Sequence, residues 1–223
     1  MMRATAKPGH RARGLTRAFK PGLAVLALLP MAWLVGQAVL GGLGPNPQET
    51  LIRDLGSWTI RLLVVVLLVT PLRLALAWPA LLLVRRMLGL FVFAYATLHL
   101  LAYGVFDHGA NLAKVWGDVW QRPFIAVGMA AWVLLLVLAL TSPAAMVRRL
   151  GAVRWRRVHR GVYAVAALGV LHFFWMRAGK LDFCEVWLWG GLLVGLLLLR
   201  LPVCRKRLQA LGSWRVQRAT AIK

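Results

Sequence analysis

Long apolar runs determine what this chain can fold into. An α-helix needs ~20 apolar residues to cross a hydrocarbon core of ~30 Å. Only 15% of the residues are charged, whereas soluble domains carry roughly 25%, and the alternating pattern of a membrane barrel is absent from the sequence. The sequence predicts an all-α integral membrane protein, a six-helix transmembrane bundle with helices at residues 22–40, 58–76, 87–106, 123–140, 158–176 and 186–201.

The basic residues lie in clusters that predict the orientation of the bundle. A basic arm (residues 1–20) and a basic tail (residues 205–223) flank the helical domain, residues 21–204. Most of the 28 Lys and Arg residues fall in these two segments, in the connection between the second and third predicted helices, and in that between the fourth and fifth. All 6 acidic residues fall in the other three connections, which lie on the opposite side. Because Lys and Arg gather on the cytoplasmic side of membrane proteins, we expect both termini in the cytoplasm.

The formal net charge of +22 invites a nucleic-acid partner. The basic residues lie in short clusters between apolar runs, which is where membrane topology and lipid headgroups place them. We therefore expect membrane lipid and no nucleic acid as the partner of these charges. Cys184 and Cys204 fall on opposite sides of the predicted membrane, so we expect no disulfide between them.

Two histidines lie inside the apolar runs, where an ionisable side chain is costly unless the protein uses it. At 1.5 Å per residue, His99 lies ~18 Å and His172 ~21 Å along its helix from the cytoplasmic side. The two side chains therefore lie at nearly the same depth. Ala96 and Gly169 each lie three residues earlier on the same helix face, which leaves room for a planar group beside each imidazole.

Several roles fit such a pair. A proton relay would normally add Asp or Glu, and zinc would need further ligands; the predicted helices supply no acid or cysteine at this depth. Haem iron needs only axial ligands and apolar walls, so haem fits the residues best. Hydrogen-bonded structural histidines, with small residues that allow close helix packing, are the simpler alternative.

A third histidine, His159, lies at the cytoplasmic end of its helix, ~20 Å from His172 along the axis. This is roughly the separation of two stacked haems. The matching position on the helix of His99 holds Arg85 and Arg86 instead of a histidine. His159 is therefore a candidate ligand without a clear partner, and an interfacial histidine among arginines is the alternative.

Several motifs resemble one known family. The chain is similar to the haem-binding membrane subunits of periplasmic methionine sulfoxide reductase systems, which belong to the ferric-reductase-like transmembrane family. The likeness covers about residues 22–205. It rests on Arg-Arg-Met-Leu-Gly-Leu (85–90), Ala-Thr-Leu-His-Leu (96–100), Trp-Arg-Arg-Val-His-Arg-Gly-Val-Tyr (155–163) and Leu-His-Phe-Phe-Trp (171–175), with Gly-Gly-Leu-Gly-Pro-Asn-Pro (41–47) and Thr-Ser-Pro-Ala-Ala-Met (141–146).

The resemblance implies b-type haem, one or two per chain, with His99, His159 and His172 as its ligands, and FMN as a further cofactor. It implies an electron-transfer subunit, rather than a catalytic subunit, in the bacterial inner membrane. Electrons would pass from a cytosolic flavin reductase or from quinol to a periplasmic molybdopterin subunit, MsrP, which reduces methionine sulfoxide in oxidised envelope proteins. The missing histidine at Arg85 and Arg86 departs from the two-haem pattern of the family and leaves a second haem open.

Two other functions stay open at this point. The chain contains no G-x-G-x-x-G motif, so we expect a separate protein or a lipid-soluble carrier as the electron donor. The same haem bundle would also suit a stand-alone ferric or quinone reductase. A non-redox membrane scaffold or transporter is the third hypothesis, and the lack of acidic residues in the predicted helices disfavours transport.

Overall fold

The computed structural model describes residues 10–178 and 182–221, and over these residues it consists of helices and turns. Residues 1–9 of the predicted arm and residues 222–223 of the predicted tail lie outside the described part. The elements in chain order are α1 (His10–Val39), α2 (Pro47–Ala75), the 3-10 turn η1 (Pro79–Leu81), α3 (Leu82–Phe106), α4 (Leu112–Gln121), α5 (Pro123–Leu140), α6 (Ala144–His159), α7 (Val162–Ala178), α8 (Cys184–Leu198) and α9 (Pro202–Ala221).

The helices form a transmembrane bundle, as predicted. Within the described residues, α8 and α9 meet at 79° and make a sixth candidate span if the bent pair is counted as one. Large apolar side chains of α1 face outward, with Leu26 62% and Trp33 67% exposed, which suits contact with lipid. Apart from that pair, five stretches of the described chain are long and apolar enough to cross a membrane: Phe19–Val39, Pro47–Ala75, Pro79–Phe106, Pro123–Leu140 and Ala144–Ala178.

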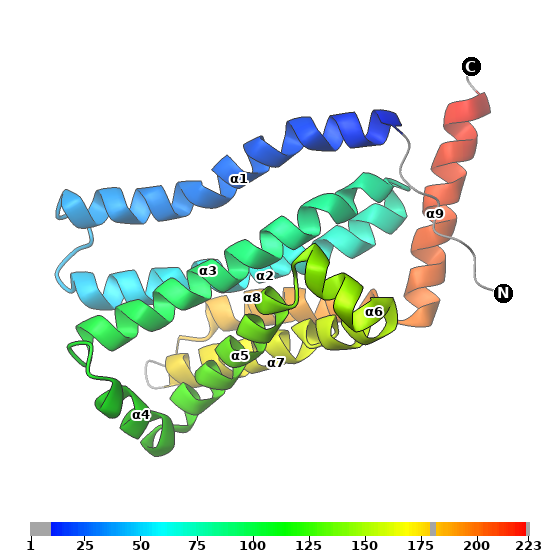
Figure 1. The fold of residues 1–223 in the computed structure, drawn as a ribbon. Coiled ribbons are helices and arrows are strands. Elements are labelled where there is room, and N and C mark those ends of the chain that lie inside the picture. The colour runs from blue at the N-terminus through cyan, green and yellow to red at the C-terminus, as the bar shows by residue number, and fades with distance from the viewer. Residues whose placement is uncertain (1–9, 179–181, 222–223) are drawn as a thin grey trace.

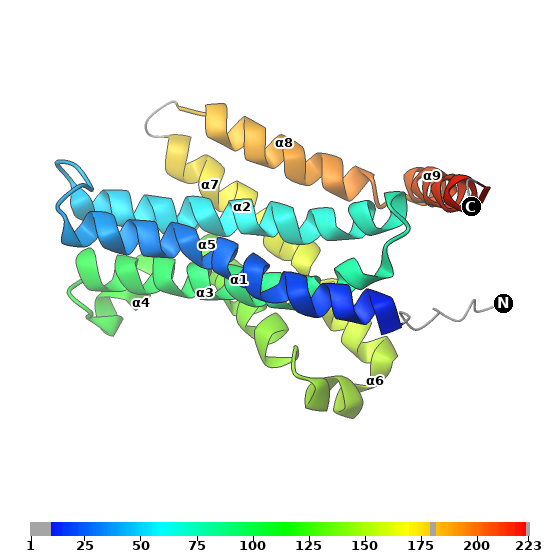
Figure 2. The same ribbon diagram turned by 90° about the horizontal axis from the view of Figure 1, so that it is seen from above.

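Two helix pairs make up the centre of the bundle. α2 packs along α3, and α5 packs along α7. α4 lies at one end of the bundle, while α6 and α9 lie at the other (Figures 1 and 2). These are called the α4 end and the α9 end below. α1 starts at the α9 end, so the first and last helices approach the same end of the bundle (Figure 1).

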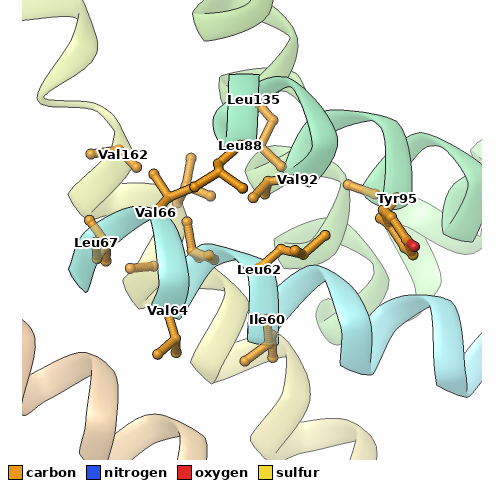
Figure 3. Packing of buried hydrophobic residues seen from close by; sticks show 14 of the residues in the cluster. Ile60, Leu62, Val64, Val66, Leu67, Leu88, Val92, Tyr95, Leu135 and Val162 are labelled. Carbon is orange, nitrogen blue, oxygen red and sulfur yellow. The ribbon is translucent and has the colours of Figure 1, made fainter. Parts of the chain in front are cut away.

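The core lies where the two pairs meet. Leu67 is 0% and Val92 is 1% exposed, and Leu88, Leu135 and Val162 pack around them (Figure 3). Lipid tails are as apolar as these side chains, so the hydrophobic effect gives little drive for helices to associate within a membrane. Close packing and polar contacts between helices must therefore hold the pairs together.

A tyrosine hydroxyl supplies one such polar contact. Tyr95 on α3 donates to the carbonyl of Ala27 at 2.8 Å and accepts from the amide of Met31 at 3.0 Å. In a continuous helix these two backbone groups would bond to each other. The hydroxyl is thus inserted into the hydrogen-bond ladder of α1, next to Pro30, and attaches α1 to α3.

Several helices begin earlier than predicted, because the prediction followed apolar residues and the first turns of these helices are polar. α2 begins at Pro47, after Asn46 accepts from the amide of Glu49. α4 lies in the segment predicted as a loop, and Asn111 caps it in the same way. Such caps are readable from sequence, whereas apolar runs reveal only membrane-spanning residues. α1 likewise begins within the predicted arm, and α6 and α9 form within basic segments that the search for apolar runs did not include.

Gly212 of α9 lies against the end of α2. A Cβ built at Gly212 would overlap the carbonyl oxygen of Leu74. We therefore expect Gly212→Ala to displace α9 and to destabilise the protein by roughly 1–3 kcal/mol, seen as a lower melting temperature in detergent. Gly191→Ala in α8 is the matched control, because no atom lies within 4 Å of its built Cβ. Equal melting temperatures for the two variants would contradict this packing.

Candidate functional site

His99 on α3 and His172 on α7 face each other between the two helix pairs. Their ring centroids lie 6.2 Å apart, and the ring planes are inclined by 78°. Both side chains line a cavity of about 390 Å³, called the α4-end cavity below. The structure therefore brings together the two histidines that the sequence places at one depth.

Each imidazole is held by the other helix of its own pair. Nδ1 of His99 lies 2.8 Å from the carbonyl oxygen of Ile52 on α2, and Nδ1 of His172 lies 2.7 Å from that of Phe124 on α5. A carbonyl oxygen only accepts, so Nδ1 must carry the proton and donate it. In the neutral ring this leaves Nε2 with a free lone pair, which is the arrangement of a metal-ligating histidine with a backbone partner.

A glycine lies against each of these rings. Gly56 follows Ile52 by one helical turn, and Gly128 follows Phe124 by one turn. A Cβ built at Gly56 would lie 3.1 Å from the ring of His99, and one built at Gly128 would lie 2.8 Å from the ring of His172. α2 and α5 thus offer the same seat, formed by a carbonyl and a glycine one turn later.

Neither seat was expected from the sequence. The small residues expected beside the ring, Ala96 and Gly169 on the helices of the histidines themselves, do line the cavity. The seats lie on the facing helices, and the pairing of helices is not visible in the sequence. The available signal was an isolated glycine inside each helix, which often marks a close approach.

The α4-end cavity has apolar side chains at its inner end and charged ones at the end toward α4, which is called its mouth below. Leu63, Leu135 and Val165 form its deep wall. The charged residues of its lining all come from the parts of α2, α3, α5 and α7, or their flanking turns, that lie toward the α4 end: Glu49, Arg53, Asp107, Arg122 and Arg177.

A hydrogen-bond cluster fastens α4 beside this mouth. One oxygen of Asp118 accepts from the hydroxyl of Tyr103 at 2.6 Å and from Arg122 at 3.1 Å. Nε2 of His108 lies 3.1 Å from the same oxygen and 2.8 Å from the Tyr103 hydroxyl. The hydrogen bond from Tyr103, followed by that from Arg122, lowers the pKa of the Asp118 carboxyl below its ordinary value.

His159 lies in a second cavity of about 770 Å³, the α9-end cavity, and does not line the first. Its ring stacks on Trp155 with centroids 3.9 Å apart, and its Nδ1 lies 3.2 Å from the Trp155 carbonyl oxygen. Among the described residues that line this cavity none is acidic. The basic ones come from several helices and turns: Arg73, Arg85, Arg86, Arg156, Arg160, Arg200 and Arg205.

Three buried polar atoms of the α9-end cavity have no hydrogen-bond partner in the described structure. They are Nε of Arg73, Nε of Arg200 and Oγ1 of Thr70. A buried donor without an acceptor is costly, and the cost grows where like charges gather. The cavity is therefore suited to an anionic group that supplies acceptors. Leu63 and Leu135 line both cavities, so these two side chains form the wall between them.

Known proteins match the chain over the helices that build both cavities. Residues 55–170 match the family described as ferric reductase like transmembrane component. A relative from Polaromonas naphthalenivorans is 49% identical over 81% of this chain and 82% of its own length. Relatives from Herminiimonas arsenicoxydans and Rhodospirillum rubrum are each 46% identical, over 81% and 82% of this chain and 83% and 88% of their own lengths.

All three relatives carry the name protein-methionine-sulfoxide reductase heme-binding subunit MsrQ. The chain belongs to the ferric-reductase-like transmembrane family and, within it, to the MsrQ group of membrane subunits. The family match includes His99 and His159, and His172 lies just beyond its end.

The lowered pKa of Asp118 predicts a pH dependence of the position of α4. A carboxyl whose pKa is depressed by folding stabilises the fold above its unfolded pKa of ~3.9 and loses that contribution as the pH falls through the lower, folded value. A spin label at Lys114→Cys, with Cys184 and Cys204 replaced, should show α4 becoming mobile over this acid range. Asp118→Asn should make the label mobile already at pH 7, and an immobile label there would contradict the role of Asp118.

Proposed function

We propose that this chain is a haem b subunit that carries electrons across the bacterial inner membrane to a periplasmic methionine sulfoxide reductase. The observation that carries the proposal is the pair of histidines in the α4-end cavity, each with Nδ1 bonded to a carbonyl. Rings 6.2 Å apart leave room for one metal ion with two metal–nitrogen bonds of ~2 Å each. The apolar walls and the two glycine seats also fit a flat, bulky group, so the residues present fit haem.

The chain's own residues have three tasks in this function. His99 and His172 would hold the iron, and the carbonyls of Ile52 and Phe124 fix each ring in one tautomer, which would make its Nε2 a stronger ligand. The apolar wall excludes water, which sets the dielectric around the haem and thereby its potential. The haem itself supplies reversible one-electron transfer.

The distribution of charge supports an orientation for this transfer. The α9 end carries arginines that meet no acid among the described residues lining the cavity, and it carries the basic segments of α6 and α9. Positive charge favours the cytoplasmic side. We therefore infer that electrons enter at the α9 end and leave at the α4 end. The periplasmic acceptor would be a molybdopterin subunit, MsrP, and the donor a cytosolic flavin reductase or quinol.

We infer further that the α9-end cavity holds FMN at the point of electron entry. A flavin phosphate is a compact anion, and guanidinium groups such as those of Arg85 and Arg86 bind phosphate through paired N–H donors. Trp155 and Tyr163 give the same cavity aromatic surface for the flavin ring. Leu63 and Leu135, which line both cavities, would lie between this cofactor and the haem. A second haem bound by His159 is the alternative occupant.

Removal of either histidine should abolish the haem of the α4-end cavity. We expect His99→Ala and His172→Ala to lose the b-type optical spectrum, because the haem would lose one of the two histidines that hold it. His108→Ala should retain it, since His108 does not line the cavity. Reduced-minus-oxidised spectra and haem content of the purified proteins measure this. A colourless wild-type protein produced with ample haem would refute the proposal.

The glycine seat provides a second variant for the same measurement, in which both histidines remain. Gly128→Ala should lower haem retention, because its Cβ would displace the ring of His172. Gly191→Ala, whose built Cβ meets no atom within 4 Å, should retain haem like the wild type. Equal retention in both variants would show that the seat does not position the ring.

The occupant of the α9-end cavity can be tested independently of the haem pair. We expect Arg85→Gln to lower the FMN content of the purified protein several-fold, because a charge-assisted bond to phosphate is worth ~1.5–3 kcal/mol, and to leave the haem spectrum unchanged. Arg148→Gln on α6 is the control, since Arg148 does not line the cavity. Flavin released by acid is quantified by fluorescence. A loss of haem, rather than flavin, in His159→Ala would assign the cavity to a second haem.

A further inference from the structure

We propose that the haem lies in the α4-end cavity with its two propionates at the α4 end, bound there by Arg122 and Arg177. This inference rests on the proposed function, since it takes haem as the ligand of His99 and His172. It adds the direction in which the haem is inserted and two positioning residues that hold it.

The polarity of the cavity differs between its two ends. Haem b carries two carboxylates, and an ionised carboxylate buried among apolar groups costs several kcal/mol or more unless it is paired. The deep wall of the cavity consists of apolar side chains such as Leu63, Leu135 and Val165, whereas every charged lining residue lies at the mouth. Propionates turned inward would meet the two leucines that separate this cavity from the arginines of the α9 end.

Arg177 lies at the end of α7, beside the mouth of the cavity. Its side chain is only 12% exposed, and its guanidinium lies 5.5 Å from the ring centre of Phe173, the neighbour of His172 in the chain. Two of its nitrogens bond to Asp182 and Glu185. A guanidinium has five N–H donors, so the two acids fix its position while leaving donors for a propionate.

Arg122 precedes the first residue of α5 and lines the same end of the cavity. Its guanidinium lies 5.4 Å from the ring centre of Phe124, the residue whose carbonyl accepts from His172. Its bond of 3.1 Å to Asp118 holds it beside the cavity, and its side chain is 51% exposed. Arg122 and Arg177 thus stack on the two aromatic residues that adjoin His172. One carboxylate holds Arg122 in place and two hold Arg177.

This orientation places the propionate edge of the haem at the surface where electrons would leave. The mouth lies beside α4, which Asp118 ties to α3 through Tyr103 and to α5 through Arg122. An acceptor protein docked at the α4 end would then approach the propionate edge directly. Arg122 and Arg177 would thereby position the haem for transfer in addition to retaining it.

The test compares haem b with its dimethyl ester, in which both propionates are neutral. The full chain, produced under haem limitation, is titrated with each compound and the b-type spectrum is followed. We expect Arg122→Gln and Arg177→Gln each to weaken haem b binding about tenfold, which corresponds to ~1.4 kcal/mol, and to leave ester binding unchanged. Lys114→Gln, a neutralised cation on α4 outside the cavity lining, should change neither affinity.

Ester binding also reports whether a variant is folded. If a variant binds the ester as the wild type does but has lost no affinity for haem b, its arginine does not hold a propionate and the proposal is overturned. Equal weakening for both compounds overturns it as well, because the arginine would then shape the cavity only. If the wild type binds neither compound, the haem function itself fails. Arg86→Gln should leave both affinities unchanged, and a selective loss of haem b affinity there would reverse the orientation.

Discussion

The bonds from the two imidazoles to backbone carbonyls are the interaction on which this bundle depends. Within a membrane, helices gain little from the hydrophobic effect, and a buried N–H without an acceptor is costly. His99 and His172 meet both constraints, because each donates to a carbonyl of the neighbouring helix. That carbonyl has a second lone pair, so it can accept the imidazole without leaving the helical ladder. The same bond packs a helix pair and fixes the tautomer of a ligand.

The two ends of the bundle differ in whether their arginines are paired with carboxylates of the chain. At the α4 end Arg122 and Arg177 are each paired with carboxylates, so the positive charge there is largely balanced within the chain. At the α9 end the arginines that line the cavity meet no acid among the described residues of its lining. The α9 end therefore requires anions from outside the chain, whether from a cofactor, from lipid headgroups or from a partner. At the α4 end the chain's own carboxylates take some N–H donors of each arginine and leave others for a propionate.

Helix geometry explains what could be predicted from the sequence. The depth of His99 and His172 follows from a fixed rise per residue, and the structure brings the two rings together. The seats at Gly56 and Gly128 could not be predicted, because they depend on which helices pair and in which register. α4, α6 and α9 were missed for another reason: they are polar or amphipathic, and the search for apolar runs does not detect such helices, although Asn111 marked the start of α4.

The two cavities are unequal in a way that decides how a two-cofactor chain of this kind can work. The α4-end cavity offers two facing histidines in an apolar setting, which suits a metal held by axial nitrogens. In the α9-end cavity, Arg85 and Arg86 occupy the helix start where a partner for His159 would have to lie. That cavity offers one histidine and many donors, so it is built for an anion more than for a second bis-histidine iron. Leu63 and Leu135 line both cavities, so a cofactor in one would lie next to a cofactor in the other. Two chemically different cofactors could then exchange electrons across these leucines. Such a chain would not need the same ligand set in both cavities.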